Sequence, residues 1–186
     1  MSLTSPPIPL QVVLAALVLV AAVTDVRSRR IPNWLTLSGV VAGILLNWFL
    51  NVDRFNWRTA LLGMGLAFLV YFPLYLLRGM GAGDVKLMAA IGALVGPANW
   101  FAIFILSNVL GGVAAVVLLL SRGRLWGTFR NVGYMLNELL HFRPPYLKRE
   151  ELDVKSPKAA TMPHGLAIAF GSLAFLLAAW IWVPRV

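Results

Sequence analysis

Long apolar runs dominate this sequence and limit what it can fold into. A helix needs about 20 mostly apolar residues to cross the hydrocarbon core of a bilayer, and the 186 residues contain several runs of that length. Hydrophobic residues make up 60% of the chain and charged residues only 12%, whereas a soluble domain carries roughly 25% charged residues. Lipid must therefore cover much of the apolar surface. We predict an all-α, polytopic membrane protein.

We expect about six transmembrane helices in a single membrane-embedded domain covering residues 1–186. Five runs are long enough for a full span. The sixth is short and ends at Gly96-Pro97, a pair that breaks helices, so a re-entrant segment is the alternative for it. The expected spans are 8–24, 34–50, 59–77, 85–96, 98–120 and 163–183.

The positive charges predict the orientation of these spans. Cytoplasmic loops carry an excess of Lys and Arg, and the loops after the first, third and fifth spans hold 13 of the 16 basic residues. We therefore place these loops, including 122–162, in the cytoplasm and both termini on the other side. The net charge of +9 then reflects this bias and attraction to anionic lipid, and we expect no nucleic-acid partner.

The cytoplasmic loop 122–162 contains one segment with apolar residues at helical spacing. Such a segment is typical of an amphipathic helix that lies on the membrane surface. Its apolar residues are Trp126, Phe129, Val132, Leu136, Leu139 and Leu140.

The composition leaves few candidates for catalysis. The chain has no cysteine and two histidines, which excludes a thiolate metal site and a cysteine nucleophile. We expect no metal and no cofactor. Of the seven acidic residues, five fall in expected loops or in the surface helix. Asp25 and Asp84 instead lie where the first span ends and the fourth begins, at the same membrane face, and ionisable groups at such depths tend to be functional.

Each aspartate alone has a structural explanation. Asp25 could pair with Arg27 or Arg29, and Asp84 could cap the following helix. Together they predict an aspartic peptidase, in which one carboxylate takes a proton from water and the other, protonated, polarises the scissile carbonyl. Two carboxylates held close together favour this state because both cannot easily be charged.

The glycines before Asp84 fit the same hypothesis. Gly81 and Gly83 would permit positive φ angles and the close approach of a substrate backbone. A plain turn between two spans is the other interpretation.

Three segments resemble the type IV prepilin peptidases, which are intramembrane aspartic peptidases of the GxGD type. The first is DVRSRRIPN at 25–33, with an aspartate followed by five residues and then Ile-Pro-Asn. The second is GAGDVK at 81–86, and the third is MPHGLAIA at 162–169. The resemblance extends from about residue 10 to residue 183.

This resemblance implies an endopeptidase that cleaves the leader peptide of prepilin or pseudopilin precursors at the cytoplasmic membrane face. Asp25 and Asp84 would be its catalytic pair. Lys86 also fits a positive-inside anchor, and His164 fits either a proton shuttle or a polar residue at the membrane interface. The residues that would shape the loop or contact the substrate are Gly81, Gly83, Lys86, Ile31, Pro32 and Asn33.

Larger members of the family carry a cysteine-rich zinc site and an N-methyltransferase domain. Because this chain lacks cysteine, it is similar to the short peptidases of tight-adherence (Flp-type) pilus systems, and we expect cleavage without methylation in the bacterial inner membrane. Archaeal preflagellin peptidases share both aspartate motifs. The expected partners are a precursor peptide and membrane lipid. A catalytically inactive component of a pilus or secretion apparatus, or a proton-coupled transporter, are the competing hypotheses.

Overall fold

A computed structural model of the chain describes residues 3–52, 55–77, 80–121, 130–134, 137 and 164–182. These residues form helices, and they contain isolated bridges such as Val52–Phe55 but no strand. Within these described residues, five helices are long and apolar enough to cross a membrane. They confirm the predicted all-α class of a polytopic membrane protein. The helices are α1 (Ile8–Ser28), α2 (Asn33–Leu50), α3 (Trp57–Leu76), α4 (Ala82–Ser121) and α6 (His164–Trp182).

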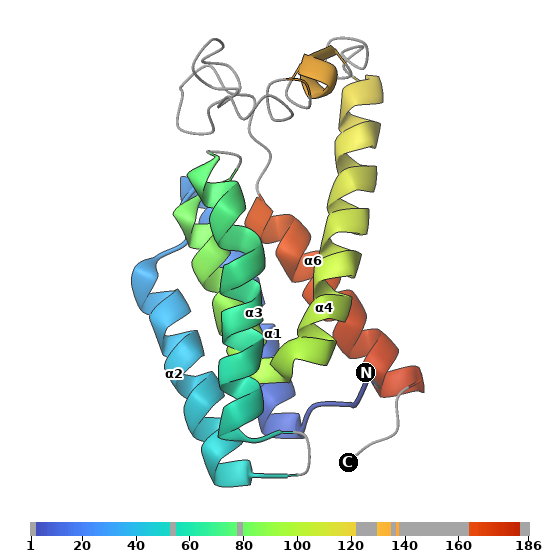
Figure 1. Cartoon of the computed structure of the whole chain (residues 1–186). Helices are drawn as coiled ribbons and strands as arrows, with labels where there is room; N and C mark the ends of the chain where they lie inside the picture. The colour runs from blue at the N-terminus through green and yellow to red at the C-terminus, as the bar shows by residue number, and fades with distance from the viewer. Residues whose placement is uncertain are drawn as a thin grey trace.

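Helix α4 consists of two halves. A straight helix of its 40 residues would measure about 60 Å, twice the roughly 30 Å of a bilayer core. Gly96 interrupts it with a φ of 75° and a ψ of 174°, a conformation that glycine adopts without a steric penalty. Figure 1 shows the chain reversing direction at this bend. The expected spans 85–96 and 98–120 correspond to the two halves.

The connections between helices gather at the two ends of the bundle. In Figure 1 the α1–α2 and α3–α4 connections and the start of α6 lie at one end, whereas α1 begins and α6 finishes at the other. The last turn of α1, the start of α4 and the start of α6 therefore meet at one end, which we call the basic end because the Arg-rich segment 27–30 lies there. Which side of the membrane it faces remains a prediction. Residues 130–134 and 137 of the expected surface helix are helical, and the rest of that loop lies outside the described residues.

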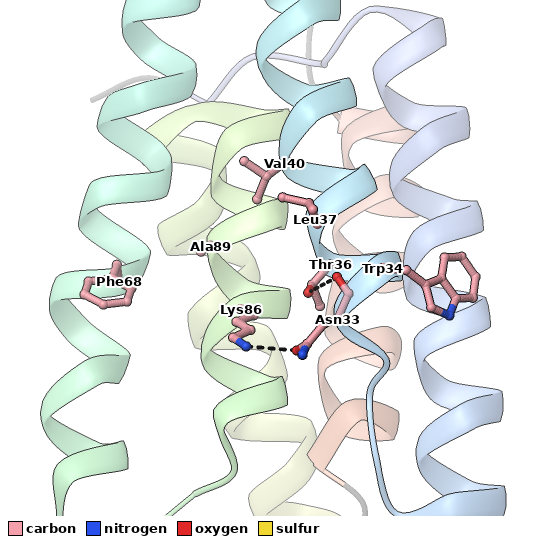
Figure 2. A pocket seen from close by; sticks show the side chains of 8 residues that line it. All are labelled: Asn33, Trp34, Thr36, Leu37, Val40, Phe68, Lys86 and Ala89. Carbon is pink, nitrogen blue, oxygen red and sulfur yellow. Dashed lines mark hydrogen bonds between the residues drawn. The ribbon is translucent and has the colours of Figure 1, made fainter.

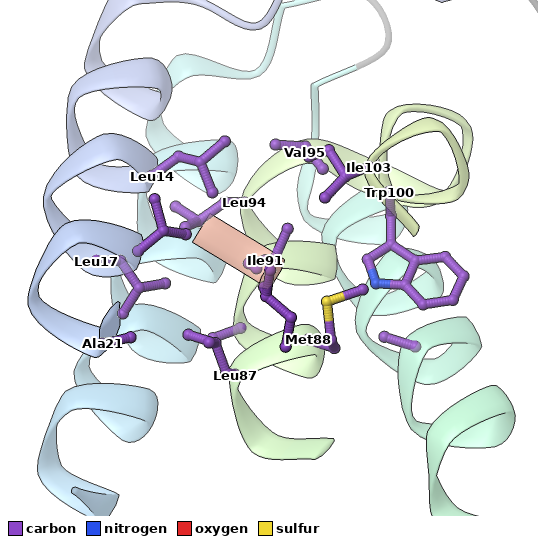
Figure 3. Packing of buried hydrophobic residues seen from close by; sticks show 14 of the residues in the cluster. Leu14, Leu17, Ala21, Leu87, Met88, Ile91, Leu94, Val95, Trp100 and Ile103 are labelled. Carbon is purple, nitrogen blue, oxygen red and sulfur yellow. The ribbon is translucent and has the colours of Figure 1, made fainter. Parts of the chain in front are cut away.

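The first half of α4 is the centre of the bundle. From Asp84 to Gly96 every residue except Lys86 is buried, and Figure 3 shows its apolar side chains packing between α1 and the start of the second half. Small residues make this possible, because Gly92 packs backbone to backbone against Gly63 of α3 and Gly43 of α2 packs against Ala93. Not every glycine of α4 has such a contact, since a Cβ added at Gly112 would meet nothing within 4 Å.

The bend in α4 leaves carbonyl groups that need other partners. Pro97 has no N–H, so it cannot bond to the carbonyl four residues earlier, and an unpaired polar group inside a membrane is costly. Asn47 of α2 meets this need, since its Nδ2 lies 3.1 Å from the Ala93 oxygen and 3.2 Å from the Leu94 oxygen. The side chain is buried, and it links α2 to the end of the central helix.

Candidate active site

Asp25 lies in the last turn of α1 and is buried, with 8% of its surface exposed. Its Oδ2 accepts a hydrogen bond of 2.8 Å from the backbone N–H of Gly165, the second residue of α6. A side chain at position 165 would have its Cβ 2.9 Å from that same oxygen. Glycine is therefore required for the α6 backbone to approach the carboxylate so closely.

Asp84 is the third residue of α4 and is 9% exposed. Its Oδ2 accepts a hydrogen bond of 3.3 Å from the N–H of Gly81, the residue before the helix. This is the reciprocal half of a capping box, in which the third helical residue binds back to the cap. Asp84 therefore does contribute to capping, although from the third position of the helix rather than from the N-cap itself.

The two carboxylates lie close enough to interact electrostatically. Asp84 interacts electrostatically with both Asp25 and His164, so the ends of α1, α4 and α6 bring three ionisable side chains together. His164 is exposed and begins α6, directly before the glycine that binds Asp25. The structure thus gathers Asp25 and Asp84, which are 59 positions apart in the sequence, into one partly polar site at the basic end.

The two sequence segments that contain the aspartates also contact each other. A Cβ on Gly83 would lie 3.1 Å from the Cβ of Ile31, and Lys86 Nζ donates a hydrogen bond of 2.9 Å to Asn33 Oδ1. Pro32 is the residue directly before α2, and Asn33 begins that helix. Ile31 and Asn33 therefore join the start of α4 to the start of α2.

The glycines before Asp84 are needed for a different reason than the sequence suggested. Neither Gly81 nor Gly83 has a positive φ, since Gly96 is the glycine with that conformation among the described residues. Gly83 instead allows Ile31 to approach, and Gly81 supplies the N–H that binds Asp84. The role of these glycines is close packing and a backbone donor, not an unusual backbone turn.

Two residues beside the site carried no clear signal in the sequence. Gly165 belongs to the MPHG segment, but spacing alone did not indicate that its N–H would bind Asp25. Tyr71 of α3 is buried and interacts electrostatically with Asp84. An aromatic residue in the middle of an apolar span ordinarily indicates packing, so only the fold could place its phenol near the carboxylate.

The described residues contain no group of three or more His, Cys, Asp or Glu side chains that could hold a metal ion. What the site does offer is two carboxylates, each held by a backbone N–H. The fold and site together define a polytopic helical membrane protein with a pair of buried aspartates at one end of the bundle.

Comparison with known proteins assigns the family. Residues 12–116 match the type IV leader peptidase family, and the chain belongs to it. Both aspartate segments, 25–33 and 81–86, lie inside the matched region, whereas 162–169 lies beyond it.

Three relatives illustrate the similarity. A prepilin leader peptidase/N-methyltransferase of Myxococcus xanthus is 29% identical over 119 residues, which cover 60% of this chain and 35% of the relative. A preflagellin peptidase of Methanocaldococcus jannaschii is 32% identical over 80 residues, or 41% and 34% of the two chains. A prepilin leader peptidase/N-methyltransferase of Escherichia coli is 31% identical over 130 residues, or 64% and 58%. The matched region thus spans about a third to somewhat over half of these relatives, and no solved structure matches the chain.

Proposed function

We propose that this protein is an aspartic endopeptidase that removes the leader peptide of prepilin-like precursors, with Asp25 and Asp84 as its catalytic pair. The observation that carries the proposal is the pair itself. Two buried carboxylates come from different helices and from the two characteristic segments of the family, and they interact electrostatically at one end of the bundle. The relatives named as prepilin and preflagellin peptidases support the class of substrate.

The chemistry follows from two carboxylates that share one proton. The ionised carboxylate takes a proton from a water molecule while the water oxygen attacks the scissile carbonyl carbon. The protonated carboxylate donates its proton to the carbonyl oxygen, which gives a neutral tetrahedral intermediate. When the C–N bond breaks, the carboxyl that gained the water proton donates it to the leaving amine. The other carboxylate takes a proton from a hydroxyl of the intermediate, so the pair again holds one proton.

The surrounding residues keep the carboxylates in position. The N–H groups of Gly165 and Gly81 each fix one carboxylate oxygen, and a preorganised site loses less free energy to reorganisation when the charge shifts. Two contacts hold the start of α4 against the start of α2: Gly83 packs against Ile31, and Lys86 hydrogen-bonds to Asn33. We assign these residues and Pro32 to shaping the loop that presents Asp84.

We further propose that the site faces the cytoplasm of a bacterium from its inner membrane and acts on Flp-type precursors. The distribution of Lys and Arg along the sequence supports the orientation, since the basic segment 27–30 lies at the same end as both aspartates. Similarity to the short peptidases of tight-adherence systems supports the choice of substrate.

Replacing either aspartate tests the assignment. Asp25→Ala and Asp84→Ala should each lower cleavage of a co-expressed prepilin about 10²–10⁴-fold, the usual contribution of acid–base groups, with insertion into the membrane unchanged. A gel shift of the precursor measures cleavage, and Asp153→Ala in the 122–162 loop is the matched acidic control. Normal processing by both single variants would rule out the catalytic pair.

The main alternative is a catalytically inactive component of a pilus or secretion apparatus. It predicts no processing by the wild-type chain of any co-expressed Flp-type precursor, whereas pilus assembly would still require the protein. Purified protein reconstituted with a precursor in vesicles separates the two hypotheses.

The Gly165 contact gives a second test that leaves both carboxylates in place. Gly165→Ala puts a methyl group against Asp25 Oδ2 and should lower cleavage about 10–100-fold, because displacement of a catalytic group by about 1 Å has effects of this size. Gly112→Ala, where the side chain meets open space, is the control. Equal cleavage by both variants would mean that the Gly165 N–H does not position Asp25.

A further inference from the structure

A groove opens on the outside of the bundle, between α2 and α3 and over the first half of α4. Its volume is about 440 Å³, within the range of about 300–1,000 Å³ that is usual for ligand pockets, and its lining includes Leu37, Val40, Phe68 and Ala89. Leu37 and Phe68 are exposed. In a protein whose helices cross a membrane, such an opening faces lipid.

One end of this groove is polar and positively charged. Figure 2 shows Lys86 and Asn33 together at that end, joined by their hydrogen bond, with Leu37 and Val40 farther along α2. Asn33 is the first residue of α2 and Lys86 the fifth of α4, so both lie within about one and a half turns of the basic end. The polar end is therefore at the depth where lipid head groups lie.

The groove is separate from the carboxylate site. Residues two apart on a helix differ by about 200° around its axis, so Lys86 points away from the side of α4 that carries Asp84. Its partner Asn33 is a neutral amide, which leaves the charge of the ammonium uncompensated by that contact. An ammonium has three N–H donors, and one bond to Asn33 leaves donors for a further oxygen ligand.

We propose that this groove binds one anionic glycerophospholipid, with its phosphate at Lys86 and Asn33 and an acyl chain along Leu37, Val40 and Ala89. Basic pockets between transmembrane helices are suited to anionic head groups. The positive charge at the groove's entrance disfavours a basic leader peptide, whereas its apolar lining suits an acyl chain.

Lipid retention by the full-length protein tests the site without reference to cleavage. The protein is reconstituted in vesicles of equal parts phosphatidylglycerol and phosphatidylcholine, extracted in mild detergent and examined by native mass spectrometry. We expect the wild type to retain one phosphatidylglycerol. Lys86→Gln should lower its retention about fivefold, the effect of one basic residue near an anionic surface, and Ala89→Leu should lower it by filling the groove while the charge remains.

Matched controls separate the groove from general effects of charge and size. Arg58→Gln removes one exposed basic residue near the start of α3, at the opposite end, and Ala178→Leu adds the same bulk at an exposed position of α6. Both should retain phosphatidylglycerol as the wild type does. Unchanged retention in Ala89→Leu, or equal loss in Arg58→Gln and Lys86→Gln, would overturn the proposal.

A photo-crosslinking residue at position 40 identifies the occupant directly. Crosslinks to phosphatidylglycerol are expected in the presence and in the absence of a co-expressed prepilin. Crosslinks to the prepilin or to a second copy of this chain, in place of lipid, would overturn the assignment of the groove. Because Asp25→Ala and Asp84→Ala should retain the lipid, failure of the peptidase assignment would be distinguishable from failure of this one.

Discussion

The two halves of α4 are both rich in apolar residues but have very different surroundings. Between Asp84 and Gly96 nearly every side chain is buried, whereas after the bend only one stripe, Asn99, Trp100, Ile103 and Ser107, is buried. Val113 and Val117 are 58% and 60% exposed. The first half is therefore covered by protein over most of its circumference, apart from the groove at Lys86 and Ala89, and the second half faces lipid over most of its circumference.

The composition of the two halves explains this difference. The first half is rich in Ala and Gly, and small residues let helix backbones approach closely in a membrane, as Gly92 does at Gly63. The second half carries Phe, Ile, Leu and Val outward, where these large side chains contact lipid and do not keep other helices apart. A central helix that packs tightly over most of its circumference is a rigid support for the aspartate at its start.

The largest expected difference in stability is between a bulky substitution in the first half of α4 and the same substitution in the second half. Gly92→Leu places a side chain where the Gly63 carbonyl lies, and since backbone cannot give way as a side chain can, we expect a loss of at least about 3 kcal/mol of unfolding free energy, at the upper end for overpacked cores. Gly112→Leu should have little effect. Thermal unfolding in detergent measures both, and similar melting temperatures would contradict the proposed asymmetry.

A smaller effect is expected when the bend loses its polar partner. Asn47→Leu removes the donor to the Ala93 and Leu94 carbonyls and should cost about 1–3 kcal/mol, the usual penalty for leaving buried groups unpaired. Asn108→Leu in the second half, where an exposed amide bonds to the Phe104 carbonyl of its own helix, should cost less. Denaturation in mixed micelles ranks the two, and a reversed ranking would mean that Asn47 does not stabilise the bend.

The smallest effect concerns the buried stripe of the second half. The hydroxyl of Ser107 is buried with no hydrogen-bond partner among the described residues, at the point where α4 packs against Gly171 of α6. Ser107→Ala should leave stability unchanged or raise it by up to about 1 kcal/mol, because it removes an unpaired polar group without changing the packing. A loss of stability of more than that amount would show that the hydroxyl has a partner.

The sequence alone determined the features that depend on local chemistry. Runs of apolar residues fix which segments can enter lipid, the Gly96-Pro97 pair marks a break in a helix, and the two aspartate segments are recognisable by residue type and spacing. These properties do not depend on which residues are close in space, because hydropathy, proline's missing N–H and motif spacing follow from residue type and order alone.

Only the tertiary structure decided which residues from distant segments contact and hydrogen-bond to each other. Three features depend on contacts between distant segments. Gly165 supplies the N–H for Asp25, and Asn47 binds the carbonyls freed at the bend. Lys86 faces a groove, whereas Asp84 faces α1 and α6. Small residues mark the faces of an apolar helix that can pack closely, but the sequence does not say which residue of another helix each face will contact. Those partners are decided only when the helices pack.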